Sequence, residues 1–289
     1  RSSDLYKDMI SKTHISYSSL CEHCFKFLPK PLNKWRRDFI IDVLWLFLSI
    51  YGRINFSQLG RYGNYCEQRY RQQFEEPFEF MNFNAAIVKQ YCSERRVIAF
   101  DPSYIPKSGK QTPGIGKFWS GCAGSVKWGL EISGIAAIDL ENHTAIHLEA
   151  VQTIPDKQIT LIDYYAELLT DRAKDLLKLS DTVVCDAYFS KKPFVTKLVS
   201  AGLHVVSRFR DDVRLQYIIP KVMTGKRGRP KEYQGAVDLE NLDMNHFSLV
   251  EQENKEVLIY QAIVKAVALK RTVKVIFVQY MDSGEVKAS

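Results

Sequence analysis

The spacing of apolar residues changes part of the way along the chain. Between residues 34 and 92 apolar positions recur at helical spacing, which predicts helices over 35–51, from Asn55 onward, and over 82–91. From residue 97 onward the apolar runs are short and strand-like, and the strands expected from them alternate with two helices. The expected elements are strands at 97–100, 130–140 and 144–151, a helix over 157–178, a strand at 182–185, a helix over 192–200 and a strand at 204–209.

This order, βββαβαβ, is that of the ribonuclease H fold and predicts an α/β protein built on a mixed sheet with helices. Beyond residue 209 the order is lost, and two β-rich runs at 257–269 and 272–280 predict a pair of strands joined by a basic turn. We therefore expect a helical region over 1–95, a ribonuclease H-like core over 96–209 and a β-rich insertion over 210–289.

Composition and charge indicate which classes of protein the chain can belong to. The chain has 289 residues, 46% of them hydrophobic, which is enough to bury the core of a globular protein. A net charge of +7 favours a polyanionic partner. The most apolar stretch, residues 39–50, is interrupted by Asp42 and is shorter than the roughly 18 residues that suggest a membrane span, so we expect a buried helix and no membrane association.

Six cysteines are scattered without the spacing of a disulfide framework and without a secretory signal ahead of them, which favours reduced thiols and a cytoplasmic location. Cys21 and Cys24 resemble half of a zinc site. No second Cys/His pair follows at finger spacing, so we expect no metal there.

Two aspartates follow two of the expected strands. Asp101 comes after the run at 97–100, and Asp186 comes after the run at 182–185. Strands of an α/β sheet deliver side chains to the carboxyl edge, where such sheets bind ligands, and carboxylate oxygens are the ligands that Mg²⁺ prefers. The alternative is that each aspartate caps a turn or helix. The segment after Asp101 contains prolines and lysines and predicts a loop rather than a capped helix.

Basic residues near these acids predict contact with phosphate groups. Lysines follow Asp101 on a Gly/Pro-rich segment, and a further pair follows Asp186; they are Lys107, Lys110, Lys117, Lys191 and Lys192. The helical region carries arginines and tyrosines on the same segments, over 61–71, which is typical of a small DNA-binding unit. Exposed, solvated charges remain the alternative for both groups.

A second basic segment begins near residue 224. Its Arg-Gly-Arg-Pro core resembles an AT-hook, which places arginines in a narrow minor groove, and the candidate DNA contacts are Lys226, Arg227, Arg229 and Lys231. Non-specific phosphate contact and a solvated loop are the alternatives.

Two motifs together resemble the DDE transposases of bacterial insertion sequences. The first is IAFDPSYIPKSGKQTPGIGKFWSG over 98–121, and the second is VVCDAYFSKKPF over 183–194. The resemblance implies that Asp101 and Asp186 are the first two catalytic carboxylates and that they hold two divalent ions, Mg²⁺ or Mn²⁺. It also implies double-stranded DNA, as element ends and target, for a partner, and a homodimer as the acting form.

The third acid of such enzymes is a glutamate within a Tyr-x-x-Arg-x-x-x-Glu pattern, and no such pattern follows Asp186. We expect this glutamate beyond Ser289, so that the present chain is a fragment that is inactive on its own. Two alternatives stay open: a ribonuclease H-like nuclease or resolvase without strand transfer, and a catalytically inactive DNA-binding protein derived from a transposase.

Overall fold

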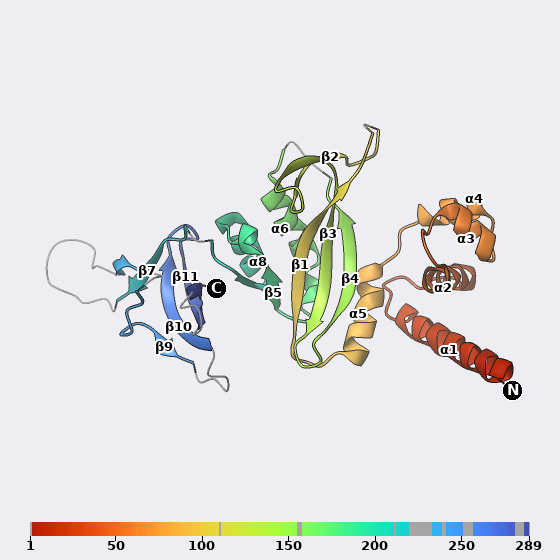
Figure 1. The fold of residues 1–289 in the computed structure, drawn as a ribbon, viewed down its shortest axis with the longest axis horizontal. Coiled ribbons are helices and arrows are strands. Elements are labelled where there is room, and N and C mark those ends of the chain that lie inside the picture. Colours follow the sequence, from red (N-terminus) through yellow and green to blue (C-terminus); the bar gives the residue numbers. More distant parts are fainter. Residues whose placement is uncertain are drawn as a thin grey trace. The chain divides into compact units, whose positions relative to one another are not determined.

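A computed structural model of the chain describes residues 2–109, 111–154, 158–210, 212–219, 233–238, 241–250, 257–280 and 286–288. Its contacts divide the chain into two compact units. The first comprises Arg1–Arg96 with Ala136–Glu149, and the second comprises Val97–Ile135 with Ala150–Ser289. Figure 1 colours both along the sequence.

The first unit is built mainly from five helices: α1 (Ser2–Phe25), α2 (Lys34–Ser49), α3 (Phe56–Tyr62), α4 (Glu67–Phe74) and α5 (Phe80–Tyr91). Asparagine side chains cap the N-termini of α2 and α3. The Asn33 side chain accepts a hydrogen bond from the Arg36 N–H, and the Asn55 side chain accepts one from the Gln58 N–H. Apolar residues from all five helices form one core: Cys21, Cys24, Phe25, Leu28, Phe39, Ile40, Val43, Leu46, Leu59, Tyr70, Phe83 and Ala86.

The apolar stretch over 39–50 is part of α2, and its Phe39, Ile40, Val43 and Leu46 are buried in this core. Burial, with the neighbouring Cys24, raises the pKa of the Cys21 thiol to about 11, so this thiol is protonated at neutral pH. Within the described ranges, no helix combines the length and apolar character needed to cross a lipid bilayer.

A six-stranded mixed sheet follows, with strand order β2-β3-β1-β5-β6 and with β4 also pairing with β3 (Figure 1). β5 runs parallel to both β1 and β6, whereas β2 is antiparallel to β3. The strands are β1 (Arg96–Pro106), β2 (Gly116–Ser120), β3 (Ser125–Asp139), β4 (Thr144–Gln152), β5 (Thr182–Cys185) and β6 (His204–Ser207). The predicted order βββαβαβ is present, with β2 as an addition.

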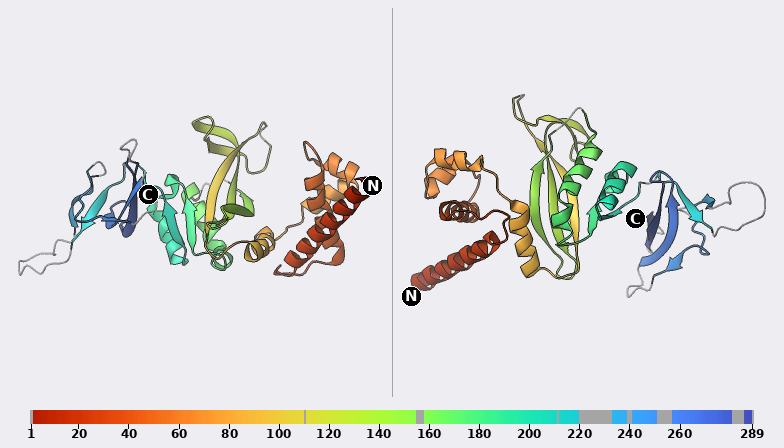
Figure 2. Two further views of the ribbon diagram at one scale, coloured as in Figure 1. Left: turned by 60° about the horizontal axis from the view of Figure 1, so that its bottom comes forward. Right: turned by 180° about the vertical axis from the view of Figure 1, so that it is seen from behind.

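Helices α6 (Leu161–Asp171), α7 (Ala173–Leu176) and α8 (Lys192–Ser200) lie in sequence around β5, and a short 3₁₀ helix, η1 (Ala187–Phe189), follows β5. Figure 2 shows α6 and α8 in front of the sheet when the chain is seen from behind. Aromatic rings join the two layers: the Phe100 ring lies 5.8 Å from that of Tyr165 on α6, and the Phe189 ring lies 4.9 Å from that of Phe194 on α8. One face of the sheet is therefore packed against helices.

Three details of the core differ from the prediction. The helix expected over 157–178 is divided into α6 and α7, and Thr160 rather than an earlier residue caps α6 by accepting from the Asp163 N–H. Strand β2 was not predicted. β1 does not end at residue 100 but continues through Asp101 to Pro106. Because β5 ends at Cys185, the last part of β1 has an open edge on that side, and prolines are tolerated on strand edges.

The second sheet belongs to the second unit and has strand order β12-β11-β10-β7-β8, with β9 also pairing with β10. Its centre is the antiparallel β10–β11 ladder, which runs from Val257↔Tyr280 to Ala266↔Arg271 and confirms the predicted strand pair. The strands are β7 (Leu215–Ile218), β8 (Tyr233–Ala236), β9 (Ser248–Leu249), β10 (Val257–Ala266), β11 (Arg271–Tyr280) and β12 (Val286–Ala288).

Candidate active site

Asp101 lies on β1, and Asp186 directly follows the neighbouring parallel strand β5. β1 and β5 pair in the register Ile98↔Val183 and Ala99↔Val184, and the same register continued by two residues sets Asp101 opposite Asp186. Adjacent strands lie about 4.8 Å apart. The structure therefore brings together the two acids that the sequence singles out.

Both carboxylates project from the face of the sheet that α6 and α8 leave uncovered. Phe100 and Cys185, the residues just before them, are buried, and successive side chains of a strand point to opposite faces. Asp101 and Asp186 are themselves exposed. A ligand approaching this face reaches both carboxylates without displacing the core.

The electrostatics of the pair favour a cation. Partial burial, and then the negative charge of Asp186, raise the pKa of the Asp101 carboxyl above its ordinary value. In the described part of the chain, no donor forms a hydrogen bond with the Asp101 carboxylate. Two hard oxygen donor groups that repel one another fit a divalent ion such as Mg²⁺ or Mn²⁺. Among the described residues, no cluster of three or more acidic, His or Cys side chains adds a further ligand.

Asp186 is held rigidly by its surroundings. One oxygen, Oδ1, accepts a hydrogen bond from the Tyr188 N–H at 2.9 Å and so caps η1, while its backbone oxygen accepts from Ser207 Oγ at 2.7 Å. The capping alternative therefore applies to one oxygen of this carboxylate. Phe189 anchors η1 in the aromatic core, so the backbone that follows Asp186 is held in place.

Lys191 lies beside Asp186, as its place in the second motif suggested. Its Nζ is 3.6 Å from the centre of the Tyr188 ring. Burial and the positive charge of Arg210 lower its pKa, while the negative charge of Asp186 raises it, so all three charges are within electrostatic reach of one another. Lys192, the first residue of α8, is exposed.

The remaining predicted cations are spread more widely. Lys107 is exposed after the end of β1, and Lys117 is exposed on β2. The other five predicted contacts lie outside the described residues: Lys110, Lys226, Arg227, Arg229 and Lys231.

Two hollows next to η1 add basic residues that the sequence reasoning missed. One, of about 440 Å³, is lined by Ala187, Arg208, Phe209, Arg210 and Asp212. The other, of about 340 Å³, includes Lys191, Arg210 and Arg214 in its lining. The sequence contains three arginines after β6, Arg208, Arg210 and Arg214. Their position near Asp186 could not be predicted, because it depends on the parallel pairing of β6 with β5.

Two other acids within the sheet are engaged in packing. Glu131 on β3 is buried and accepts a hydrogen bond from the Tyr165 hydroxyl at 2.5 Å, on the face that α6 covers. This carboxylate and burial raise the pKa of the Tyr165 hydroxyl above its ordinary range, burial being the larger cause. Glu131 was missed because strand alternation in the sequence does not show which polar residue faces the core.

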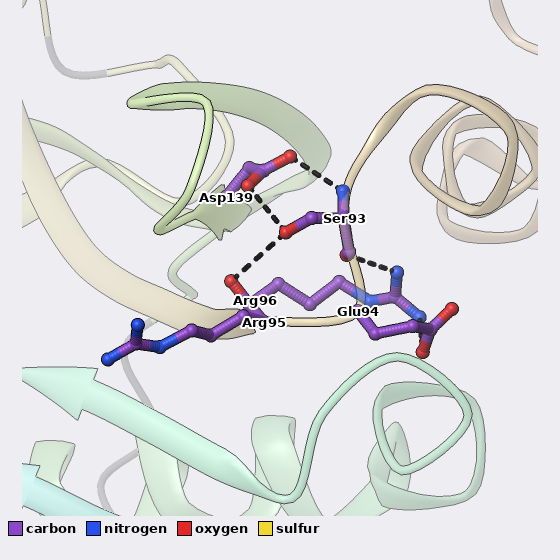
Figure 3. Close-up of polar contacts among 5 residues, drawn as sticks. All are labelled: Ser93, Glu94, Arg95, Arg96 and Asp139. Carbon is purple, nitrogen blue, oxygen red and sulfur yellow. Dashed lines mark hydrogen bonds and ion pairs between the residues drawn. The ribbon is translucent and has the colours of Figure 1, made fainter.

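Asp139, the last residue of β3, is fully buried and is satisfied by donors (Figure 3). Ser93 donates to it through its N–H and its hydroxyl, each at 2.7 Å, and Asn142 donates through its N–H and its side-chain amide. The nearby Arg96 guanidinium donates to the backbone oxygen of Ser93 at 2.7 Å. This cluster holds the β3–β4 turn to the segment before β1 and leaves Asp139 no capacity for a ligand.

Two tyrosines of the segment over 61–71, Tyr65 and Tyr70, serve packing. Tyr70 is fully buried and donates to Asp42 at 2.5 Å, and the Tyr65 ring packs 5.4 Å from that of Phe39. Arg71 pairs with Glu67 on α4. Exposed residues of this region, such as Arg61 and Tyr62, remain candidate DNA contacts, whereas Tyr65 and Tyr70 do not.

Comparison with known proteins adds the family. Residues 82–263, from α5 to β10, match the model of the DDE superfamily endonucleases. No curated protein sequence matches the chain. The matched segment is more than half of the chain, includes Asp101 and Asp186, and confirms the ribonuclease H-like mixed α/β fold that the order of elements predicts. The chain accordingly belongs to the DDE superfamily of endonucleases, a family of nuclease-type enzymes.

Proposed function

We propose that this chain is a DNA transposase of the insertion-sequence type, in which Asp101 and Asp186 direct the cleavage and transfer of DNA strands. The observation that carries the proposal is that both acids follow the paired residues of β1 and β5, close enough for the charge of Asp186 to act on Asp101. This pairing lies within the segment that matches the endonuclease family.

The reaction is a displacement at phosphorus. In the first step a water oxygen bonds to phosphorus and the bond to the 3′ oxygen breaks, which leaves a 3′ hydroxyl. In the second step this hydroxyl attacks a target phosphodiester, and the target's own 3′ oxygen leaves. DDE enzymes generally use divalent metal ions, which would activate the attacking oxygen and neutralise charge on the phosphate. Asp101 and Asp186 are the residues that would hold them.

The basic side chains around η1 would bind the DNA backbone. Lys191 and Arg210 lie beside Asp186, where they supply positive charge to a phosphate held at the acid pair. Lys107, Lys117 and Lys192 are exposed and would contact flanking phosphates. Double-stranded DNA as the partner, and a homodimer as the acting form, follow from the proposed activity.

The test measures cleavage and end joining separately. Asp186→Asn, made in a longer protein that contains this chain, removes a charge but keeps the side-chain size, so we expect loss of Mg²⁺-dependent cleavage of at least about 100-fold. Asp171→Asn, which changes an exposed carboxylate on α6, is the matched control and should leave cleavage intact. Cleavage that survives Asp186→Asn contradicts the assignment.

Two further readouts decide between neighbouring functions. Joining of a 3′ end to target DNA distinguishes a transposase from a nuclease or resolvase that only hydrolyses. Thermal unfolding tests the metal site without activity. Mg²⁺ should stabilise the wild-type protein, because it relieves the repulsion between Asp101 and Asp186, and it should stabilise Asp186→Asn less. Equal stabilisation of both proteins would count against the site.

A further inference from the structure

The β2–β3 hairpin exposes two tryptophans on one face. β2 and β3 pair in the register Lys117↔Trp128 and Trp119↔Val126, so these four side chains share a face of the ribbon. Trp119 is 61% exposed and Trp128 is 48% exposed. They are diagonal neighbours, which is within reach for aromatic side chains in a common contact. In the part of the chain that the structure describes, neither indole stacks on another ring.

This exposed face is continuous with the face that carries Asp101. On β1, Tyr104 and Phe100 point to the packed face and Asp101 points away from it. On β3, Gly129 shares the packed face, since a Cβ added to it would lie 2.5 Å from the Tyr104 ring, and Trp128 therefore shares the face of Asp101. β3 runs directly beside the acid, because a Cβ on Gly134 would lie 3.5 Å from the Asp101 backbone oxygen.

The hairpin has a packed side that holds its exposed side in place. Phe118, between Lys117 and Trp119, is 1% exposed on the opposite face. The Tyr104 hydroxyl donates to the Trp128 backbone oxygen at 2.9 Å and so attaches the hairpin to the end of β1. The tryptophans therefore extend from a fixed backbone, and the fold does not bury them.

The charge of this segment complements a polyanion. Between Pro102 and Leu130 the sequence contains four lysines, at 107, 110, 117 and 127, and no aspartate or glutamate. Lys117 stands directly across from Trp128 on the exposed face. Aromatic rings interleaved with cations, without acids, are typical of surfaces that bind single-stranded nucleic acid.

We propose that Trp119 and Trp128 form a stacking platform that binds unpaired bases of the DNA strand whose phosphate lies at Asp101 and Asp186. This proposal rests on the proposed function and adds to it a preference for a locally unpaired substrate. Bases inside a duplex are stacked on their neighbours and offer no free face, whereas an unpaired base offers its π-face to an indole. Lys117 binds the phosphate that joins the stacked bases.

The test compares single-stranded and duplex DNA. The probes are a fluorescein-labelled oligo-dT and a blunt duplex of equal length, bound to the full chain in EDTA so that no cleavage occurs. Trp119→Ala and Trp128→Ala should each weaken oligo-dT binding by about 5-fold to about 100-fold, which is the range for loss of one base–aromatic stack. Trp119→Phe and Trp128→Phe keep an aromatic face and should restore most of the affinity.

Matched controls separate stacking from charge and from folding. Ile263→Ala removes an exposed apolar side chain of β10 and should leave oligo-dT binding unchanged. Lys117→Ala should weaken binding more than Lys127→Ala, because Lys127 pairs with Phe118 and lies on the other face of the hairpin. Circular dichroism and thermal unfolding verify that each variant is folded.

The possible results distinguish failure of the stacking platform from failure of the proposed function. Wild-type affinity of folded Trp119→Ala and Trp128→Ala for oligo-dT overturns the stacking platform, as do equal losses on the blunt duplex. Quenching of 2-aminopurine at an unpaired position, lost in Trp128→Ala, supports it. Should Asp186→Asn still cleave DNA while the tryptophan variants lose oligo-dT binding, the catalytic assignment fails and the platform stands.

Discussion

Three aspartates in this chain differ because of the groups that face them. Asp139 is buried and accepts hydrogen bonds from Asn142, Ser93 and the Glu141 N–H. The donors of Asn142 and Ser93 lower its pKa well below the ordinary range. Asp101 is partly buried and lies near Asp186, and these two causes raise its pKa. A carboxylate already satisfied by several donors stabilises the fold, whereas this pair, in which Asp186 accepts one hydrogen bond from the Tyr188 N–H, is suited to receive a cation.

The hydrogen-bonded Asp139 carboxylate predicts how the stability of the protein depends on pH. Its folded-state pKa lies below the unfolded value of about 3.9, so its contribution is fully present above that pH and is lost as the pH falls toward the folded pKa. Asp139→Asn cannot accept from all of these donors. We expect an unfolding temperature several degrees lower at pH 7 and a weaker dependence of stability on pH below about 4.

Thermal unfolding monitored by circular dichroism between pH 2.5 and 7 measures both effects. Glu141→Gln, at an exposed neighbouring carboxylate, is the control and should behave as the wild-type protein does. An unfolding temperature of Asp139→Asn equal to that of the wild type at pH 7 would show that the donors are satisfied without this charge.

At the scale of elements, the junction of β1 with the β2–β3 hairpin depends on one glycine. A Cβ on Gly129 would lie 2.5 Å from the Tyr104 ring and 2.6 Å from the Ile105 backbone oxygen. The backbone oxygen cannot move aside as the end of a flexible side chain can. β3 and β1 therefore approach so closely here that only hydrogen fits between them.

Gly129→Ala should separate the hairpin from β1. We expect a destabilisation of about 1–3 kcal/mol, the usual cost of forced overpacking, and weaker attachment of the Trp128 backbone to Tyr104. Denaturant titration gives the free energy of unfolding. Gly121→Ala is the control, because a Cβ there meets no atom within 4 Å and should change stability little. If both variants unfold alike, the close approach is not a constraint.

Some elements could be predicted from the sequence for clear physical reasons. β5 and the β10–β11 pair are short apolar runs bounded by turn residues, and both occur as expected. The extension of β1 through Pro102 could not be foreseen, because proline tolerance depends on where β5 ends. β2 was missed because it is only five residues long and follows a glycine- and proline-rich segment. Asp101 and Asp186 could be singled out from the sequence because each follows an apolar strand-like run, whereas the position of Arg210 near Asp186 depends on the pairing of β6 with β5.

At the scale of the whole molecule, the net charge of +7 is distributed over several basic segments, one of which lies at 224–231 outside the described residues. Replacement of both Arg227 and Arg229 by Ala should weaken DNA binding and reduce the slope of log K against log salt by about two, if both contact phosphates. Binding titrations at several salt concentrations measure this slope.

The control for charge alone is the double variant Lys174→Ala, Lys178→Ala. These lysines lie in and just after α7, and Lys178 is already paired with Asp175 at 2.5 Å. The control removes the same charge and should leave the slope nearly unchanged. A slope that the arginine variant also leaves unchanged would identify the segment as a solvated loop.

The parallel pairing of β1 with β5 also determines when the candidate site can exist. Ile98 pairs with Val183, so the chain between them must be made and brought back to β1 before the two acids meet. Closing the long loop between β1 and β5 costs chain entropy, and the contacts of the completed sheet offset this cost. We therefore expect the β1–β5 pairing to form late in folding. By contrast, the β10–β11 hairpin closes over a four-residue turn and can form early. A nascent or partly unfolded chain therefore carries the two carboxylates far apart, and nuclease activity becomes available only to the folded protein.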